Sequence, residues 1–212
     1  MAMPRTGDRV IVKIGGSLTA DRGRLREILS SLTTASARIV IVTGGGPYAD
    51  AVREVQGRLG ISDRLAHRQA LAAMNLFAEA ICELEPALVM ATSRNEVDAA
   101  HAAGRIPIFL TDRIQTGGGG LPESWALTSD SYAAFLAFEL DAVGLVLVKS
   151  ADAPASASTG ELARDGLVDA AFPSLAARLS CPIRIIGPAT VDQLPDLVGL
   201  PRSKLGSIVT NA

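Results

Sequence analysis

The stretch "DRVIVKIGGSLTA", residues 8–20, decides the fold. An apolar run over residues 10–14 is interrupted by one lysine, Lys13, and ends in a glycine-rich turn made of Gly15, Gly16 and Ser17. Glycines let backbone N–H groups approach an anion closely, and the serine adds a hydroxyl donor. The pattern predicts a strand that ends in an anion-binding turn, although a purely structural turn explains this stretch equally well when it is taken alone.

Lysine is rare in this chain. Only Lys13, Lys149 and Lys204 among the 20 basic residues are lysines, so arginine supplies most of the surface charge. A lysine inside an apolar strand end therefore indicates a particular role for Lys13.

A second glycine cluster follows the next apolar run, in "IVIVTGGGPYADAVRE", residues 39–54. The glycines are Gly44, Gly45 and Gly46, and the proline after them suits a first helical turn. A helix N-terminus after glycines favours anion binding, because its free N–H groups and dipole attract negative charge. A tight turn without a ligand explains one glycine easily and three poorly. Two such loops after neighbouring strands predict two anionic groups held close together, as phosphoryl transfer requires.

Composition limits the class of protein. A chain of 212 residues, 48% hydrophobic and 20% charged, predicts one globular domain over residues 1–212. The net charge of -2 and the pI near 5.7 give no basic surface for nucleic acid or an anionic membrane. With no apolar run of membrane-spanning length and no signal-peptide pattern, we expect a cytoplasmic protein. Cys82 and Cys181 stand apart from each other and predict no zinc site.

Apolar strands alternate with amphipathic helices, which predicts an α/β fold: a three-layer αβα sandwich with a largely parallel central sheet. The expected strands are 9–14, 38–43, 86–91, 106–110, 143–149, 182–186 and 206–210. The expected helices include 22–34, 47–59, 65–84 and 129–140. The low-complexity segments 116–120 and 150–161 are predicted to be mobile loops.

A third informative stretch is "WALTSDSYAAFLAFELDAVGLVLVKSADA", residues 125–153. Thr128 or Ser129 is suited to cap a helix, and Asp130 falls in its first turn. Helix capping alone explains Asp130. The helix leads to a strand that ends at Lys149.

Taken together, the three stretches resemble the amino acid kinase family over roughly residues 9–210. The resemblance implies transfer of a γ-phosphoryl group from ATP, with Mg²⁺, to a carboxylate or phosphate oxygen, and it implies a homo-oligomer. The stretches "VKIGGSL", "GGGPYAD", "AHRQALAAMNLFAEAI", "SWALTSDSYAAFLA" and "VDAAFPSLAARL" resemble the branch of the family that phosphorylates an aminomethylfuran phosphate in methanofuran biosynthesis.

The resemblance also implies roles for individual residues. Lys13 would stabilise charge on the transferred phosphoryl group, and Asp130 would orient Lys13 and a second cation. The nucleotide side would comprise Gly15, Gly16, Ser17, Lys149, Ser150 and Asp152. The acceptor side would comprise Gly44, Gly45, Gly46, His67, Thr128 and Ser129. No set of protein ligands for a metal is predicted.

The chain departs from the family pattern in two places. Many relatives have Thr-Asp-Val-Asp-Gly where this chain has "KSADA", residues 149–153, and a glycine-rich segment with a second catalytic lysine is absent between 160 and 180. Both departures affect the expected nucleotide pocket and put the affinity for ATP in question. Lys149 either replaces the missing cation or is a solvated surface lysine.

Other candidates remain open at this point. His67 lies on an apolar helix face, where either core packing or substrate contact suits it, and Trp125 is suited either to cover a substrate ring or to pack. Arg68, Arg94 and Arg113 are candidates to bind an acceptor phosphate.

These features predict a kinase that acts on a small-molecule phosphomonoester, with an aminomethylfuran phosphate as the leading acceptor and a diphosphate as the product. The alternatives are a nucleotide- or oxyanion-binding protein of this fold without turnover, and a nucleoside monophosphate kinase.

Overall fold

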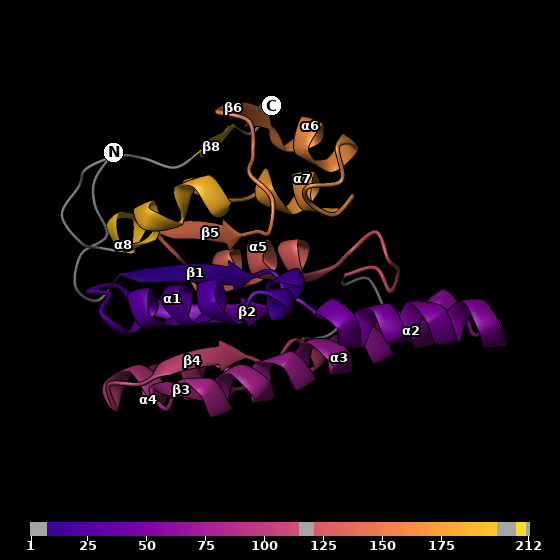
Figure 1. The fold of residues 1–212 in the computed structure, drawn as a ribbon, viewed down its shortest axis with the longest axis horizontal. Helices are drawn as coiled ribbons and strands as arrows, with labels where there is room; N and C mark the ends of the chain where they lie inside the picture. The colour runs from indigo at the N-terminus through magenta and orange to yellow at the C-terminus, as the bar shows by residue number, and fades with distance from the viewer. Residues whose placement is uncertain (1–7, 115–120, 199–206, 211–212) are drawn as a thin grey trace.

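The computed structural model describes residues 8–114, 121–198 and 207–210, and its strands form one sheet (Figure 1). The strands are β1 (Arg9–Ile14), β2 (Arg38–Thr43), β3 (Leu88–Ala91), β4 (Ile106–Phe109), β5 (Gly144–Val148), β6 (Ser156–Ser158), β7 (Ile183–Ile186) and β8 (Ser207–Thr210). Their order is β3-β4-β2-β1-β5-β7-β8-β6. The first six strands in this order are parallel, and β8 runs antiparallel to β7.

Helices cover both faces of the sheet. They are α1 (Arg22–Thr33), α2 (Gly46–Leu59), α3 (Asp63–Leu84), α4 (Arg94–Ala102), α5 (Ser129–Glu139), α6 (Thr159–Arg164), α7 (Phe172–Ala176) and α8 (Leu194–Leu197). Short 3₁₀ turns occur at Gly16–Ala20, Thr111–Arg113 and Pro188–Gln193. This arrangement confirms the predicted αβα sandwich with a largely parallel sheet. None of the helices in the described residues has the length and apolar character of a membrane span.

Side chains alternate across the central strands and divide the core into two halves. In β1, Ile11 packs in the half that contains α5 and α7, whereas Val10, Val12 and Ile14 pack in the half that contains α1 and α8. Lys13 therefore belongs to the α5 face of the sheet, although it is surrounded in sequence by core residues. The alternation in β5 places Lys149, which follows Leu145 and Leu147, on the same face.

The predicted strand and helix ranges agree with the structure to within two residues. The prediction of a mobile loop over 150–161 was wrong, because β6 and the first turn of α6 lie in it. Ser158 begins α6 with a capping box: its hydroxyl accepts from the Glu161 N–H, and Glu161 accepts from the Ser158 N–H. The segment 116–120 lies outside the described residues.

Parallel pairing brings three loops to one edge of the sheet. β1 lies between β2 and β5, with Ile14 paired to Thr43 on one side and to Val148 on the other. The loops that follow these strands are therefore neighbours at the carboxyl edge, where ligands of open parallel sheets bind. In Figure 1, α2 and the start of α3 extend beyond this edge.

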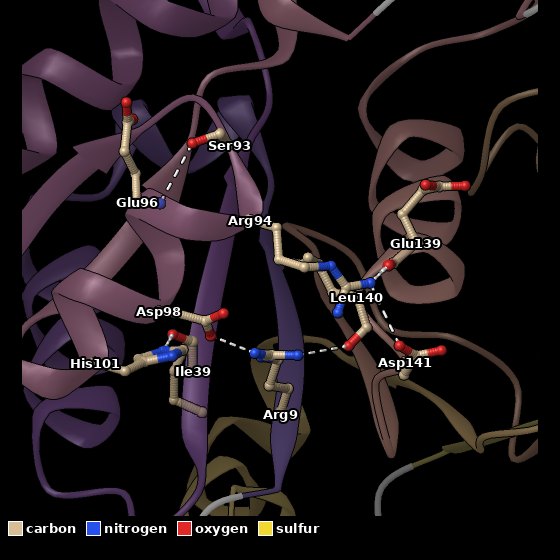
Figure 2. Close-up of polar contacts among 10 residues, drawn as sticks. All are labelled: Arg9, Ile39, Ser93, Arg94, Glu96, Asp98, His101, Glu139, Leu140 and Asp141. Carbon is tan, nitrogen blue, oxygen red and sulfur yellow. Dashed lines mark hydrogen bonds and ion pairs between the residues drawn. The ribbon is translucent and has the colours of Figure 1, made fainter.

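At the opposite edge, polar contacts tie α4 and the end of α5 to the sheet (Figure 2). The Arg9 guanidinium donates to the Leu140 carbonyl at 3.2 Å and pairs with Asp98. The His101 ring donates from Nε2 to the Ile39 carbonyl at 2.8 Å.

Arg94 belongs to the same group of contacts. Its guanidinium donates to the Glu139 carbonyl and pairs with Asp141 at 3.3 Å, at the end of α5 away from the glycine loops (Figure 2). The prediction that Arg94 is a candidate to bind an acceptor phosphate is therefore wrong.

His101 makes stability depend on pH. Burial lowers the pKa of His101 below its ordinary 6.5, aided by Arg38 and Arg9 and opposed by the Ile39 hydrogen bond and Asp98. As the pH falls, His101 is therefore protonated in the unfolded chain before it is protonated in the folded protein. The free energy of unfolding then decreases as the pH falls below about 6.5. We expect the stability advantage of the native protein over His101→Asn to shrink between about pH 7.5 and 5, as measured by urea unfolding. His67 is present in both proteins, so its titration cancels; a difference independent of pH would contradict the prediction.

Candidate active site

A buried carboxylate between two lysines forms the centre of the carboxyl edge. Asp130 Oδ1 lies 2.9 Å from Lys13 Nζ, and Asp130 Oδ2 lies 2.5 Å from Lys149 Nζ. The side chains of Lys13, Asp130 and Lys149 are 6%, 5% and 12% exposed. Interpreting Lys149 as a solvated surface lysine is therefore wrong, and so is treating Asp130 as a helix-capping residue alone.

The three charges shift each other's protonation. Burial acts to raise the pKa of Asp130, but Lys13 and Lys149 outweigh it, and the pKa is lowered below its usual range. Burial and the nearby Lys13 charge lower the pKa of Lys149 to about 8, against the opposing pull of Asp130. With both lysines protonated, the cluster carries one net positive charge in a place where water is scarce, which favours an anionic ligand.

The two glycine loops, Gly15–Ser17 and Gly44–Gly46, pack directly against each other. A Cβ on Gly16 would lie 2.1 Å from the Gly46 nitrogen, and a Cβ on Gly44 would lie 2.5 Å from the Gly16 nitrogen. Gly46 also has a φ of +51°, which favours glycine. Backbone contact between the loops therefore accounts for these glycines before any ligand is considered, and the two predicted anion sites are parts of one site.

Not every N–H group in the loops is available to a ligand. The Gly15 N–H donates to the Val148 carbonyl at 2.9 Å, and the Gly44 N–H donates to the Ile14 carbonyl at 2.8 Å. The first N–H groups of α2, beginning at Gly46, have no acceptor within the helix. Pro47 has no N–H, so Gly46 is the first donor of α2, and both junctions remain candidate anion sites.

The start of α5 is held by a carboxylate from the segment between α6 and α7. Asp169 accepts hydrogen bonds from the N–H and hydroxyl of Thr128 at 3.0 and 2.9 Å. It also accepts from the N–H of Ser131 at 3.0 Å and from the Ser131 hydroxyl. Asp169 thus replaces Thr128 and Ser129 as the capping side chain and fixes the turn that carries Asp130.

A cavity of about 390 Å³ lies beside the glycine loops. Its lining includes all six residues expected on the acceptor side: Gly44, Gly45, Gly46, His67, Thr128 and Ser129. Gly16 and Ser17 also line it, together with an apolar surface of Ala49, Ala70, Leu71, Met74 and Leu127. The structure therefore brings the predicted acceptor residues together around one space.

The remaining nucleotide-side candidates lie around the end of β5. The Ser17 hydroxyl donates to the Ser150 hydroxyl at 2.9 Å and joins the loop after β1 to the loop after β5. Asp152 accepts from the Ala189 N–H at 2.9 Å, and its Oδ1 lies where a Cβ on Gly187 would be. Asp152 therefore holds the loop after β7, and any contact with a nucleotide remains a proposal.

His67 is buried in the cavity wall and bonded on its inner side. Its Nε2 lies 3.0 Å from the Tyr132 hydroxyl on α5. Burial lowers its pKa below 6.5, against opposing contributions from the Ser124 backbone and Glu123. Near neutral pH the ring is uncharged, with Nε2 available to accept the tyrosine proton. His67 is therefore packed in the core and also lines the cavity, and its contact with a substrate stays a prediction.

The outer wall of the cavity contains an arginine that sequence reasoning missed. The Arg53 guanidinium lies 4.3 Å from the centre of the Trp125 ring and pairs with Asp50 at 2.7 Å. The Trp125 indole N–H donates to Gln56 Oε1 at 2.6 Å. Arg53 lines the cavity, whereas Arg68 and Arg113 are absent from the described lining. The spacing of three residues between Asp50 and Arg53 indicates an ion pair on a helix surface, but it does not indicate that Arg53 lines a cavity.

Comparison with known proteins identifies the family. The model of the amino acid kinase family matches residues 8–153. The chain belongs to the amino acid kinase family. It is a kinase, and membership implies that ATP is the phosphoryl donor.

Two curated relatives resemble parts of the chain. The [5-(aminomethyl)furan-3-yl]methyl phosphate kinase of Methanocaldococcus jannaschii is 32% identical over 146 residues, which cover 67% of this chain and 66% of that protein. The uridylate kinase of Aeropyrum pernix is 28% identical over 120 residues, which cover 54% of this chain and 51% of that protein. The chain thus spans about two thirds of one relative and about half of the other.

Solved structures confirm the fold. The uridylate kinase of Archaeoglobus fulgidus superposes with a TM-score of 0.73 at 18% identity, covering 95% of this chain and 99% of that one. The UMP kinase of Ureaplasma parvum gives a TM-score of 0.69 at 17% identity, covering 96% and 99%. At these identities the likeness concerns the fold.

The buried charges predict the effect of removing the carboxylate. Asp130→Asn leaves two ammonium groups close together without a counter-charge, and we expect the free energy of unfolding to fall by about 3 kcal/mol at neutral pH. Urea unfolding measures the change. Asp141→Asn is the control, because its pair with Arg94 is exposed and is expected to contribute less than about 1 kcal/mol. Equal losses in the two variants would contradict the account of the buried cluster.

Proposed function

We propose that the chain transfers the γ-phosphoryl group of ATP to the phosphate of a small phosphomonoester, with an aminomethylfuran phosphate as acceptor and a diphosphate as product. The observation that carries this proposal is the position of the Lys13–Asp130–Lys149 cluster beside a cavity whose lining includes the start of α2. The relative from Methanocaldococcus jannaschii supports the choice of acceptor.

The site favours an acceptor that needs no general base. Asp130 is paired with two lysines and has a lowered pKa, and the Nε2 of His67 is engaged by Tyr132. Among the described residues that line the cavity, Asp50 is the one carboxylate, and it lies a helical turn away from the glycine loops. A phosphate monoester has a second pKa of about 6 and is already a dianion at neutral pH. A phosphate oxygen is therefore a nucleophile without help, whereas an alcohol is not.

Charge stabilisation then accounts for the chemistry of this chain. An acceptor phosphate oxygen attacks the γ-phosphorus, the new phosphoanhydride bond forms, and ADP leaves with the electrons of the broken bond. The transferring group is negatively charged throughout, and Lys13 and Lys149 are held in place by Asp130 to stabilise that charge. Positioning and charge neutralisation suffice, so no covalent enzyme intermediate is required.

Magnesium fits this site as part of the nucleotide complex. The described residues contain no group of three or more acidic, histidine or cysteine side chains that would hold a metal ion. The donors present are cationic and amide groups, which suit phosphate oxygens. Mg²⁺ would accordingly be held mainly by the phosphates, and it supplies neutralisation of their charge when bound.

The pKa of Lys149 predicts how activity depends on pH. The free enzyme loses the Lys149 charge above about pH 8, so kcat/KM for ATP should fall about tenfold per pH unit there. Lys149→Arg keeps its charge to above about pH 12 and should lose this alkaline decline, whatever its absolute rate. Initial rates from about pH 6.5 to 9.5 measure both profiles. The same decline in both proteins would show that another group titrates.

A panel of acceptors tests the proposed function. We expect ADP release with [5-(aminomethyl)furan-3-yl]methyl phosphate and the mass of the corresponding diphosphate in the products. UMP should react much more slowly. Efficient formation of UDP without a furan diphosphate would favour the nucleoside monophosphate kinase that the Aeropyrum pernix relative represents. Binding of ATP without ADP release from any acceptor would favour a binding protein without turnover.

A further inference from the structure

The side chains of α2 divide the cavity into two chemical zones. The glycines at its start provide anion-binding N–H groups, and Asp50 follows Gly46 by four residues, about 6 Å along the helix axis. Arg53 follows by seven residues, about 10 Å along the axis. A ligand phosphate bound at the start of α2 therefore has Asp50 about one turn away along the wall of the cavity.

The carboxylate of Asp50 is paired through one of its two oxygens. Asp50 Oδ1 pairs with Arg53 NH1 at 2.7 Å, and Arg53 is itself stacked on Trp125. Trp125 is fixed in turn by its hydrogen bond to Gln56 on α2. Within the part of the chain that the structure describes, no hydrogen bond is recorded for Asp50 Oδ2. This oxygen is available to a donor on the ligand.

We propose that Asp50 is a specificity-determining residue that selects acceptors with a positively charged amine about one helical turn from their phosphate, with Trp125 and the apolar lining holding the ring between the two ends. This inference rests on the proposed function and specifies the class of acceptor. The acceptor is a zwitterion: a phosphate dianion at the start of α2, a flat apolar middle, and an ammonium group at Asp50.

The other polar groups of the cavity are less suited to this role. His67 has a lowered pKa and is uncharged near neutral pH, and its Nε2 is engaged by Tyr132. It therefore offers no negative charge to an ammonium group. Arg53 repels an ammonium group and lies too far along α2 to share the phosphate with Gly46. Asp50 is the one carboxylate among the described residues of the lining.

Two matched phosphate esters test the inference by binding alone, without turnover of the furan phosphate. These are para-(aminomethyl)benzyl phosphate and para-methylbenzyl phosphate, which differ in the ammonium group. Isothermal titration calorimetry on the native protein should give about three- to fivefold tighter binding of the amine, as expected for an ion pair with a largely exposed carboxylate. Asp50→Asn keeps the shape of the side chain and removes its charge, and should reduce the preference to less than about twofold.

Glu54→Gln is the matched control. Glu54 lies one turn further along α2, is paired with Arg58 as Asp50 is with Arg53, and is absent from the described lining. Its variant should keep the full preference for the amine. Equal binding of the two phosphates by the native protein, failure of both to bind, or a preference that survives in Asp50→Asn would each overturn the inference.

Turnover separates this inference from the proposed function. Conversion of the furan phosphate to its diphosphate without any preference for the amine would leave the proposed function in place and reject the role of Asp50. A preference that Asp50→Asn abolishes, together with no ADP release, would support the role of Asp50 and reject the proposed reaction.

Discussion

The rest of the site depends on one buried carboxylate that holds two lysines. Lys13 and Lys149 end neighbouring parallel strands and would repel each other without Asp130, which pairs with both at 2.9 and 2.5 Å. Removing three charges from water costs folding free energy. A gain in stability therefore does not explain the cluster, whereas binding of an anion does. The position of Asp130 in turn requires a fixed start of α5. Asp169 provides this through four hydrogen bonds to the turn around it. The start of α5, which carries Asp130, is thus stabilised by a segment distant in the sequence.

The contact between the glycine loops is the second constraint. Because Gly16 and Gly46 approach within backbone contact, no side chain separates the end of β1 from the start of α2. Two groups bound to these neighbouring loops are forced together, which is unfavourable for two anions and becomes productive only where cations offset the repulsion. The positive cluster therefore complements the loops. The glycines of both loops are needed for this close packing, whereas in the sequence they indicate only a loop.

Much of the fold was readable from the sequence, because strands 9–14 and 38–43 are mainly apolar and the helices between strands have clear periodicity. The resemblance to the amino acid kinase family implied that Lys13 and Asp130 act together. What the sequence could not show depends on contacts between distant segments. Nothing local in the sequence says that Asp169 caps α5 or that Arg53 stacks on Trp125. The loop prediction over 150–161 failed because small polar residues also suit a short edge strand and a capping box. Arg94 was indistinguishable from Arg53 until the chain was folded.

The two parts of the site are subject to different physical limits. Lys13, Asp130 and Lys149 lie against the core between the sheet and α5, so a change in any of them alters both charge and packing. The part of the cavity wall that α2 contributes is different, because Ala49 is the one buried residue in that helix. Asp50 and Arg53 are largely exposed, and their replacement disturbs little of the core. In the proposed function, the phosphoryl-transfer chemistry would therefore be tied to the stability of the fold, whereas the proposed choice of acceptor would be free to vary along one helix face at little cost in folding free energy.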